Sequence, residues 1–350
     1  MSEIKLTQFS HGAGCGCKIS PAVLDKILIS SSPAPNYPQL LVGNSSKDDA
    51  AIYDMGNGSA LISTTDFFVP IVDDPYQFGR IAAANAISDV YAMGGKPIMA
   101  LAILGWPINQ LSPDIAQQVI EGGRSMCAEA GIPLAGGHSV ETTEPLFGLS
   151  VNGLVSVQQL KQNNAAKEGD VLFLTKPLGV GILSTGQKKG VLEDADLQIL
   201  IAQLNKLNKV GEAMGAISGV HAMTDVTGFG LIGHLMEMAE GSNLGAIVNY
   251  NKLQILDAAK KLLAQRIVPD ATYRNWNAYS NEVAFGKGVD VMQAFSILPD
   301  PQTNGGLLIA ADPAAVNEIQ SVFRAFGLAD FIEPIGCMTS KGEKRIQVEA

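Results

Sequence analysis

Hydrophobic residues recur along the first half of the chain at two spacings, every second residue in some stretches and every third or fourth in others. Alternation is typical of strands and the longer spacing of helices. Strands are predicted at residues 50–53, 59–68, 97–104 and 146–157. Helices are predicted at residues 21–30, 74–93 and 112–130. The run Gly56-Asn57-Gly58 indicates a hairpin, and residues 135–139 are expected to form a glycine-containing loop.

The second half of the chain shows the same mixture of patterns. Strands are predicted at residues 171–175, 221–226, 247–250, 307–310 and 332–339. Helices are predicted at residues 182–188, 196–217, from 230 onward, 255–263 and 313–326. Because strands and helices mix in both halves, the fold class is α+β or α/β.

A polar segment at residues 158–169 separates the two halves and is the expected domain boundary. A length of 350 residues suits about two domains. We therefore expect a flexible arm at residues 1–19, an N-terminal domain at residues 20–157 and a C-terminal domain at residues 170–350.

The overall charge limits the classes of partner. The chain carries 34 acidic and 24 basic residues, a net charge of −10, without a block rich in lysine or arginine. Nucleic-acid binding needs a basic surface, so we expect no nucleic-acid partner. An acidic protein can still bind a nucleotide when metal ions bridge its carboxylates to the phosphates.

The N-terminal residues and the cysteines indicate a cytoplasmic protein. Residues 1–5 lack the apolar core of a signal peptide, and the longest apolar run, near residues 97–108, is too short to span a bilayer. Cys15 and Cys17 lie too close together for an ordinary disulfide framework, while Cys127 and Cys337 are expected in the core. This use of cysteine suits a reducing compartment.

Residues 11–18, with the sequence HGAGCGCK, indicate a mobile loop that carries reactive chemistry. Three glycines favour a flexible backbone that is neither helix nor strand. A cation such as Lys18 favours the thiolate form of a neighbouring cysteine and lowers its pKa. Residue chemistry alone does not rank Cys15 against Cys17. The alternative is a merely disordered terminal arm.

Acidic residues at the ends of predicted elements indicate a metal site. Asp49 precedes a strand, Asp66 lies near a strand end, and Asp225 lies between a strand and a glycine-led helix. Asn85 and Asp89 share one face of an apolar helix, where a buried carboxylate needs a partner or a metal ion. Oxygen ligands suit Mg²⁺, and Mg²⁺ suits polyphosphates. The alternatives are an Asp-rich turn at Asp49 and a helix cap at Asp225.

Other sequence signals add less. The glycine element 136–139 offers backbone N–H groups that a nucleotide could contact, whereas His138 alone is weak evidence. His221 and His234 lack the spacing of metal ligands. The chain has no GxGxxG or P-loop sequence, so any ATP must bind in another way. The residues alone therefore predict metal-dependent phosphoryl transfer with a mobile thiol.

Motifs spread over the whole chain resemble those of the selenophosphate synthetase (selenide, water dikinase) family. They are SHGAGCGCK at 10–18, KDDAA at 47–51, STTDFF at 63–68, NAISDVYAMGGKP at 85–97, AGGHS at 135–139, MTDVTGFGLIGH at 223–234 and DPQTNGGLL at 300–308. The resemblance implies an aminoimidazole ribonucleotide synthetase-like ATP-binding fold of two α+β domains, with N-terminal domains that form a dimeric barrel. It also implies synthesis of selenophosphate from selenide, ATP and water, with release of AMP and orthophosphate, as activated selenium for selenocysteine and selenouridine synthesis.

The resemblance also assigns roles to individual residues. Cys15 matches the nucleophile and Lys18 an essential lysine, while Cys17 matches a supporting position. The magnesium ligands are matched by Asp49, Asp89 and Asp225. The nucleotide contacts are matched by Lys18, Ser46, Lys47, Asp48, Asp66, Asp89, Gly137, His138 and Ser139. Asn304 stands where serine is common and Lys47 where arginine is common, and neither departure changes the expected chemistry.

Two other functions remain open from the sequence. One is another enzyme of the same superfamily, such as a thiamine-monophosphate kinase or a purine-pathway synthetase. These enzymes share the magnesium-binding aspartates. As far as the resemblance goes, they lack the GCGCK arm. The other is a non-enzymatic carrier of selenium or a metal, for which several separate acidic motifs are unnecessary.

Overall fold

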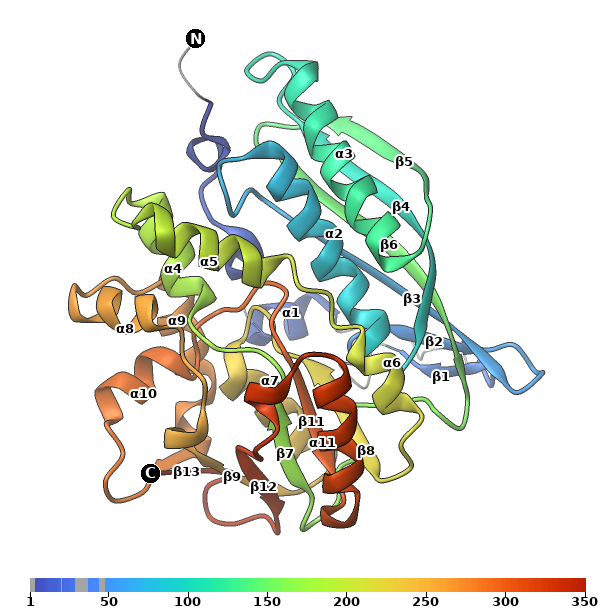
Figure 1. The fold of residues 1–350 in the computed structure, drawn as a ribbon, viewed down its shortest axis with the longest axis vertical. Coiled ribbons are helices and arrows are strands. Elements are labelled where there is room, and N and C mark those ends of the chain that lie inside the picture. Colours follow the sequence, from blue (N-terminus) through green and yellow to red (C-terminus); the bar gives the residue numbers. More distant parts are fainter. Residues whose placement is uncertain (1–3, 20, 29–36, 44–47) are drawn as a thin grey trace.

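Two sheets organise the molecule (Figure 1). A computed structural model describes residues 4–19, 21–28, 37–43 and 48–350. The strand order is β1-β2-β3-β6-β4-β5 in the first sheet and β10-β13-β9-β12-β7-β11-β8 in the second. All strands of the first sheet precede those of the second along the chain, which confirms an α+β protein with two parts. The domain bounds themselves stay predictions.

The first part begins with short 3₁₀ turns at Leu6–Phe9 and Gly14–Cys17, the second of which lies where an irregular loop was expected. Its helices are α1 (Pro21–Leu28), α2 (Pro75–Ala92) and α3 (Pro113–Ala130). Its strands are β1 (Leu40–Val42), β2 (Ala51–Asp54), β3 (Ser59–Phe68), β4 (Lys96–Trp106), β5 (Leu134–Glu141) and β6 (Leu146–Ser156).

The second part contains the remaining elements. Its strands are β7 (Val171–Leu174), β8 (Val220–Asp225), β9 (Gly245–Asn249), β10 (Val283–Phe285), β11 (Leu307–Ala311), β12 (Gly336–Thr339) and β13 (Ile346–Glu349). Its helices are α4 (Val180–Lys188), α5 (Asp194–Leu204), α6 (Val210–Gly215), α7 (Gly230–Gly241), α8 (Asp257–Ala264), α9 (Asp270–Tyr279), α10 (Val291–Ile297) and α11 (Val316–Ala325).

Helix α2 is buried along most of its length and carries polar groups into the interior. The Asp74 side chain caps it by accepting a hydrogen bond of 2.7 Å from Gln77 N, and Pro75 occupies the first helical position. A side chain at Gly79 would lie 1.8 Å from the Val119 carbonyl oxygen, so glycine allows α3 to pack closely. This packing holds the polar residues of α2 in fixed positions.

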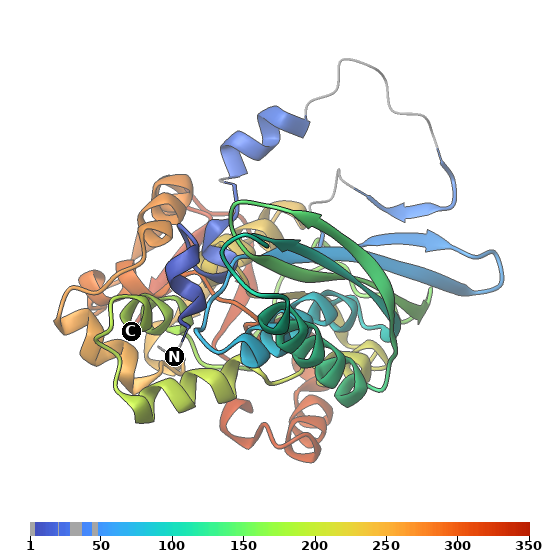
Figure 2. The same ribbon diagram turned by 90° about the horizontal axis from the view of Figure 1, so that it is seen from above.

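Helices α2 and α3 cover one face of the first sheet, and no other described helix covers the opposite face, which we call the open face (Figure 2). Large apolar side chains are exposed on the open face, among them Tyr53, Phe67, Leu101 and Leu154. Strand β5 lies at the edge of the sheet and is exposed over seven of its eight residues. An unpaired edge and an exposed apolar face are surfaces on which another chain can pack.

Several element predictions were wrong. Residues 135–139 belong to strand β5, because Gly137 brings the backbone so close to β4 that a side chain would lie 2.2 Å from the Ala102 oxygen. The single helix expected at 196–217 is two helices, α5 and α6. Between them the Asn208 side chain bonds Ser88 Oγ and the Gly305 oxygen, both at 2.8 Å.

Further elements were missed in the C-terminal part. Helices α9 and α10 and strands β10 and β13 were not predicted. Cys127 is buried as expected, whereas Cys337 is partly exposed on β12. None of the described helices is long and apolar enough to cross a membrane.

Candidate active site

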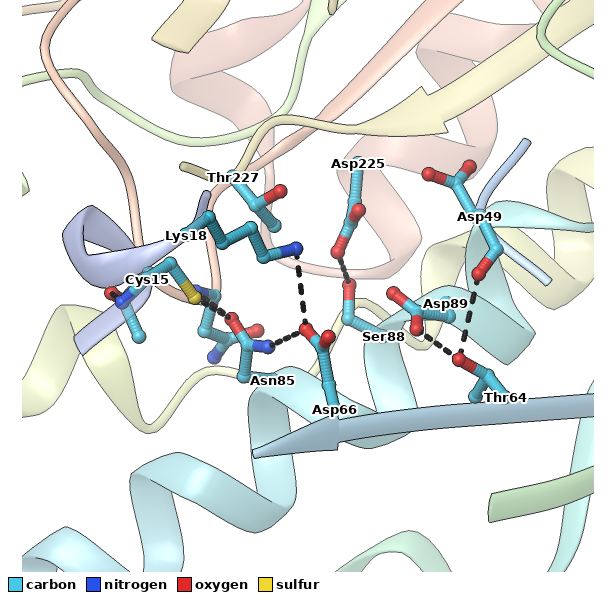
Figure 3. Close-up of polar contacts among 12 residues, drawn as sticks. Cys15, Lys18, Asp49, Thr64, Asp66, Asn85, Ser88, Asp89, Asp225 and Thr227 are labelled. Carbon is cyan, nitrogen blue, oxygen red and sulfur yellow. Dashed lines mark hydrogen bonds and ion pairs between the residues drawn. The ribbon is translucent and has the colours of Figure 1, made fainter. Parts of the chain in front are cut away.

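The arm that carries Cys15 is docked against the body of the protein, with the thiol facing inward (Figure 3). The Cys15 backbone N–H donates to Thr303 Oγ1 at 3.0 Å, and the thiol lies 3.3 Å from Asn85 Oδ1. Only 2% of Cys15 is exposed. Lys188 and Arg274 bind backbone carbonyl oxygens on the outer side of the arm. Cys15 is therefore held by Asn85 of the first part of the chain and by Thr303 of the second.

Asn85 on α2 connects the arm to the rest of the site. Its Oδ1 accepts a hydrogen bond of 2.7 Å from Asn304 N and faces the Cys15 thiol. Its Nδ2 donates to Asp66 Oδ2 at 2.7 Å, and the same oxygen lies 3.7 Å from Lys18 Nζ. The amide thus places the thiol, the Asp66 carboxylate and the Lys18 ammonium group in one network.

The docked position determines the acidity of the thiol. Burial raises the pKa of Cys15 to about 12, and the opposing effect of Lys18 is smaller. The sequence-based expectation of a lowered thiol pKa was therefore wrong for this arrangement. The pKa of Lys18 is raised, chiefly by Asp66, so its side chain stays charged. While the arm is docked without a further cation, Cys15 is a neutral thiol.

Asp49, Asp89 and Asp225 reach the site from the segment before β2, from α2 and from the end of β8. Each carboxylate accepts a hydrogen bond from a hydroxyl group: Thr224 Oγ1 at 2.9 Å for Asp49, Thr64 Oγ1 at 2.5 Å for Asp89 and Ser88 Oγ at 2.5 Å for Asp225. Burial raises the pKa of all three, and Asp225 repels both of the others. A bound cation would offset both effects.

The donor set suits Mg²⁺. Asp49 Oδ2 is buried, and no donor among the described residues lies within hydrogen-bonding distance of it. Carboxylate and hydroxyl oxygens are hard ligands of the kind that Mg²⁺ prefers. No three acidic, histidine or cysteine side chains of the described ranges surround one point closely enough to hold a metal by themselves. The assignment of these aspartates as magnesium ligands stays a prediction.

The expected nucleotide contacts are only partly assembled. Asp48 accepts hydrogen bonds from the backbone of Asp49 and Asn163, and burial raises its pKa to about 7. Ser46 and Lys47 lie outside the described residues. Gly137, His138 and Ser139 lie on β5, three strands away from Asp66. At the usual strand spacing that is roughly 14 Å, so one chain does not bring these groups together.

Polar groups that support the site were not predicted from the sequence. Lys176 is buried and donates to the carbonyl oxygens of Lys206 and Asn304, at 2.7 and 2.8 Å. Burial lowers the pKa of Lys176 to about 7. Thr303 and Asn304 belong to the glycine-containing segment 300–308, which was the only sequence signal for this support.

Comparison with known proteins identifies the family. The model of the AIR synthase related protein N-terminal domain matches residues 47–155, and that of the C-terminal domain matches residues 167–349. The selenide, water dikinase of Aeromonas hydrophila subsp. hydrophila is 55% identical over 351 residues, which is 99% of each chain. That of Yersinia pseudotuberculosis is 55% identical over 99% of this chain and 98% of its own. The chain belongs to the selenide, water dikinase family. This confirms the resemblance that the motifs indicated.

Solved structures extend the likeness to the fold alone. The thiamine-monophosphate kinase of Stenotrophomonas maltophilia aligns with a TM-score of 0.64 at 21% identity, covering 89% of this chain and 91% of that one. The hydrogenase maturation protein HypE in complex with ATP aligns with a TM-score of 0.64 at 17% identity, covering 96% and 88%. The much higher identity to the dikinases does not favour the thiamine-monophosphate kinase alternative.

Proposed function

We propose that this protein transfers one phosphoryl group of ATP to selenide and another to water, releasing selenophosphate, AMP and orthophosphate. Its family membership supports this activity. The structural observation that carries it is the seating of Cys15 against Asn85 on α2 and of Lys18 against Asp66 on β3, close to the buried Asp89 carboxylate on α2. This arrangement would bring three groups to the phosphates of ATP. They are a thiol that can hold selenium, a fixed cation and oxygen ligands for magnesium.

Asp49, Asp89 and Asp225 would hold the magnesium, with the orphaned Asp49 oxygen as one ligand atom. Bound Mg²⁺ neutralises the charge of the polyphosphate, which otherwise repels an anionic nucleophile. Lys18 contributes a further positive charge, and its contact with Asp66 orients it. Closure of the arm over the site would exclude bulk water and protect the oxidisable hydroselenide.

We infer that the nucleotide site is completed by a second copy of the chain. The open face of the first sheet and the unpaired β5 edge suit a shared barrel between two N-terminal domains. In such a dimer the Gly137–Ser139 segment of one chain can approach the carboxylates of the other, which it does not do within one chain. Exposed backbone N–H groups on β5 would then contact the nucleotide.

The dimer has a direct test in solution. Light scattering at micromolar concentration should give twice the chain mass of 36.8 kDa. Phe67→Lys on the open face should shift the mass toward the monomer and weaken ATP binding, because a charge would be buried in the interface. Phe326→Lys, which is similarly exposed after α11, is the matched control and should stay dimeric. A monomeric wild-type protein would contradict the proposal.

The activity itself is tested by product analysis under anaerobic conditions. Phosphorus NMR of protein, Mg²⁺, ATP and selenide should show selenophosphate, AMP and orthophosphate in equal amounts. Without selenide no selenophosphate forms, so productive turnover stops. ADP as the final product would indicate a simple kinase, and unused ATP would indicate a carrier. Phosphorylation of thiamine monophosphate would indicate the other branch of the superfamily.

A cytoplasmic location remains an expectation from the sequence. Cys15, Cys127 and Cys337 are free thiols in the structure, which suits a reducing compartment. Such a compartment would also keep selenide in its reduced form, and it would supply ATP and magnesium.

A further inference from the structure

Thr227, His234 and Glu237, which have no role in the site described above, form a series of close contacts that begins at the active site. Thr227 Oγ1 lies 3.2 Å from His234 Nε2, and His234 Nδ1 lies 3.2 Å from Glu237 Oε2. Thr227 precedes α7, and the other two residues lie on its first turns. Thr227 and His234 are 4% and 6% exposed. A hydroxyl, an imidazole and a carboxylate in series are a proton-transfer arrangement known from nucleophile activation.

The threonine end of this series lies beside the active site. Figure 3 shows the Thr227 side chain between Lys18 and Asp225. The adjacent Gly228 packs against the arm, because a side chain there would lie 2.6 Å from the Cys15 oxygen and 3.2 Å from Lys18 Cδ. Thr227 is therefore held beside the thiol arm on one side and the carboxylates on the other.

The contacts of His234 define the direction of proton movement. Nδ1 faces a carboxylate, so it carries the hydrogen, and Nε2 accepts from the Thr227 hydroxyl. The ring also stacks on Phe229, with centroids 5.7 Å apart, which fixes its plane. The Thr227 oxygen retains a lone pair that can accept a proton from a molecule in the site.

We propose that Thr227, His234 and Glu237 form a proton relay for the water molecule that receives the second phosphoryl group, an inference that rests on the proposed function. In this proposal hydroselenide, which is already anionic, takes the terminal phosphoryl group and needs no base. Water is neutral and ionises very little near pH 7, so it does need one. The relay therefore serves hydrolysis of the ADP that remains.

The proposed step balances atoms and charge. The water proton passes to Thr227 Oγ1 as the threonine proton passes to His234 Nε2. The water oxygen forms a bond to the β-phosphorus of ADP, and the bond from that phosphorus to the oxygen of AMP breaks with its electron pair on that oxygen. The imidazolium is stabilised by Glu237 and then returns its proton to solvent. His234 and Glu237 act through Thr227 and are positioning residues.

The test follows ATP, ADP and AMP in a single turnover, with protein in excess over ATP and selenide present. In Thr227→Val and His234→Gln, ADP should accumulate together with selenophosphate, while its conversion to AMP slows by about 10²–10⁴-fold. Thr227→Ser keeps the hydroxyl and should restore most of this conversion. The affinity for ATP, measured separately by calorimetry, should change little in all three variants.

A second histidine–carboxylate pair provides the matched control. His221 Nδ1 lies 2.8 Å from Asp170 Oδ1 near the start of β8, away from the site, and His221→Gln should retain the wild-type time course. Wild-type AMP formation in Thr227→Val, or equal slowing of ADP and AMP formation, would overturn the relay and indicate a purely structural role. A wild-type protein that makes no selenophosphate would instead overturn the proposed function.

Discussion

Cys15→Ser will abolish selenophosphate formation while the arm keeps its docked position. The serine hydroxyl can make the same contact to Asn85 Oδ1 that the thiol makes at 3.3 Å, so the seat is preserved. A hydroxyl is not ionised at neutral pH and binds selenium poorly. Loss of a nucleophile typically lowers turnover by about 10³-fold or more. Anaerobic phosphorus NMR of the variant with ATP, Mg²⁺ and selenide measures the effect.

Substitutions at Cys17 and Lys18 distinguish the loss of a reacting group from a change in packing. Cys17→Ser should retain substantial activity, because the resemblance assigns Cys17 a supporting position. Lys18→Ala should be inactive even with Cys15 intact, since Asp66 and the phosphates both lose a cation that lies 3.7 Å from the carboxylate. Lys18→Arg keeps the positive charge, so the activity of this variant tests whether the charge alone is sufficient. An active Cys15→Ser variant, or an inactive Cys17→Ser variant beside it, would reverse the assignment.

Substitution of asparagine for any one of Asp49, Asp89 and Asp225 should lower activity by about 10²–10⁴-fold while the fold persists. Asparagine keeps the size of the side chain but removes the charge that magnesium requires. Because the three groups act as one cluster, double variants should be little worse than single ones. The measurements are the rate of AMP formation and the affinity for Mg²⁺.

Thermal unfolding gives a readout that does not depend on activity. Burial and repulsion raise the pKa of each carboxyl group in the folded state, so stability falls as the pH rises from the ordinary carboxyl pKa to the raised one. Without magnesium, the asparagine variants should therefore be at least as stable as wild type at neutral pH. Magnesium should raise the unfolding temperature of wild type but not of the variants. Asp54→Asn, at the exposed β2–β3 turn, is the control. Full activity in Asp89→Asn would refute the cluster.

Local patterns in the sequence predicted much of the fold. The hydrophobic spacing predicted a helix at residues 74–93, within one residue of α2 at each end, and the Gly56-Asn57-Gly58 run predicted the hairpin between β2 and β3. These features depend on neighbouring residues, whose backbone preferences and capping bonds are encoded next to one another. The ordered motifs also predicted the family, which the comparisons confirm.

Tertiary structure decided the features that depend on distant segments. The glycines of β5 indicated a loop until the pairing with β4 showed a close backbone approach. Cys15 lies three residues from Lys18, and that spacing predicted a lowered thiol pKa, but burial against Asn85 and Thr303 has the larger effect. His234 gave no functional signal until the fold placed it between Thr227 and Glu237. Sequence spacing encodes local geometry, whereas desolvation and the meeting of remote side chains arise only from packing.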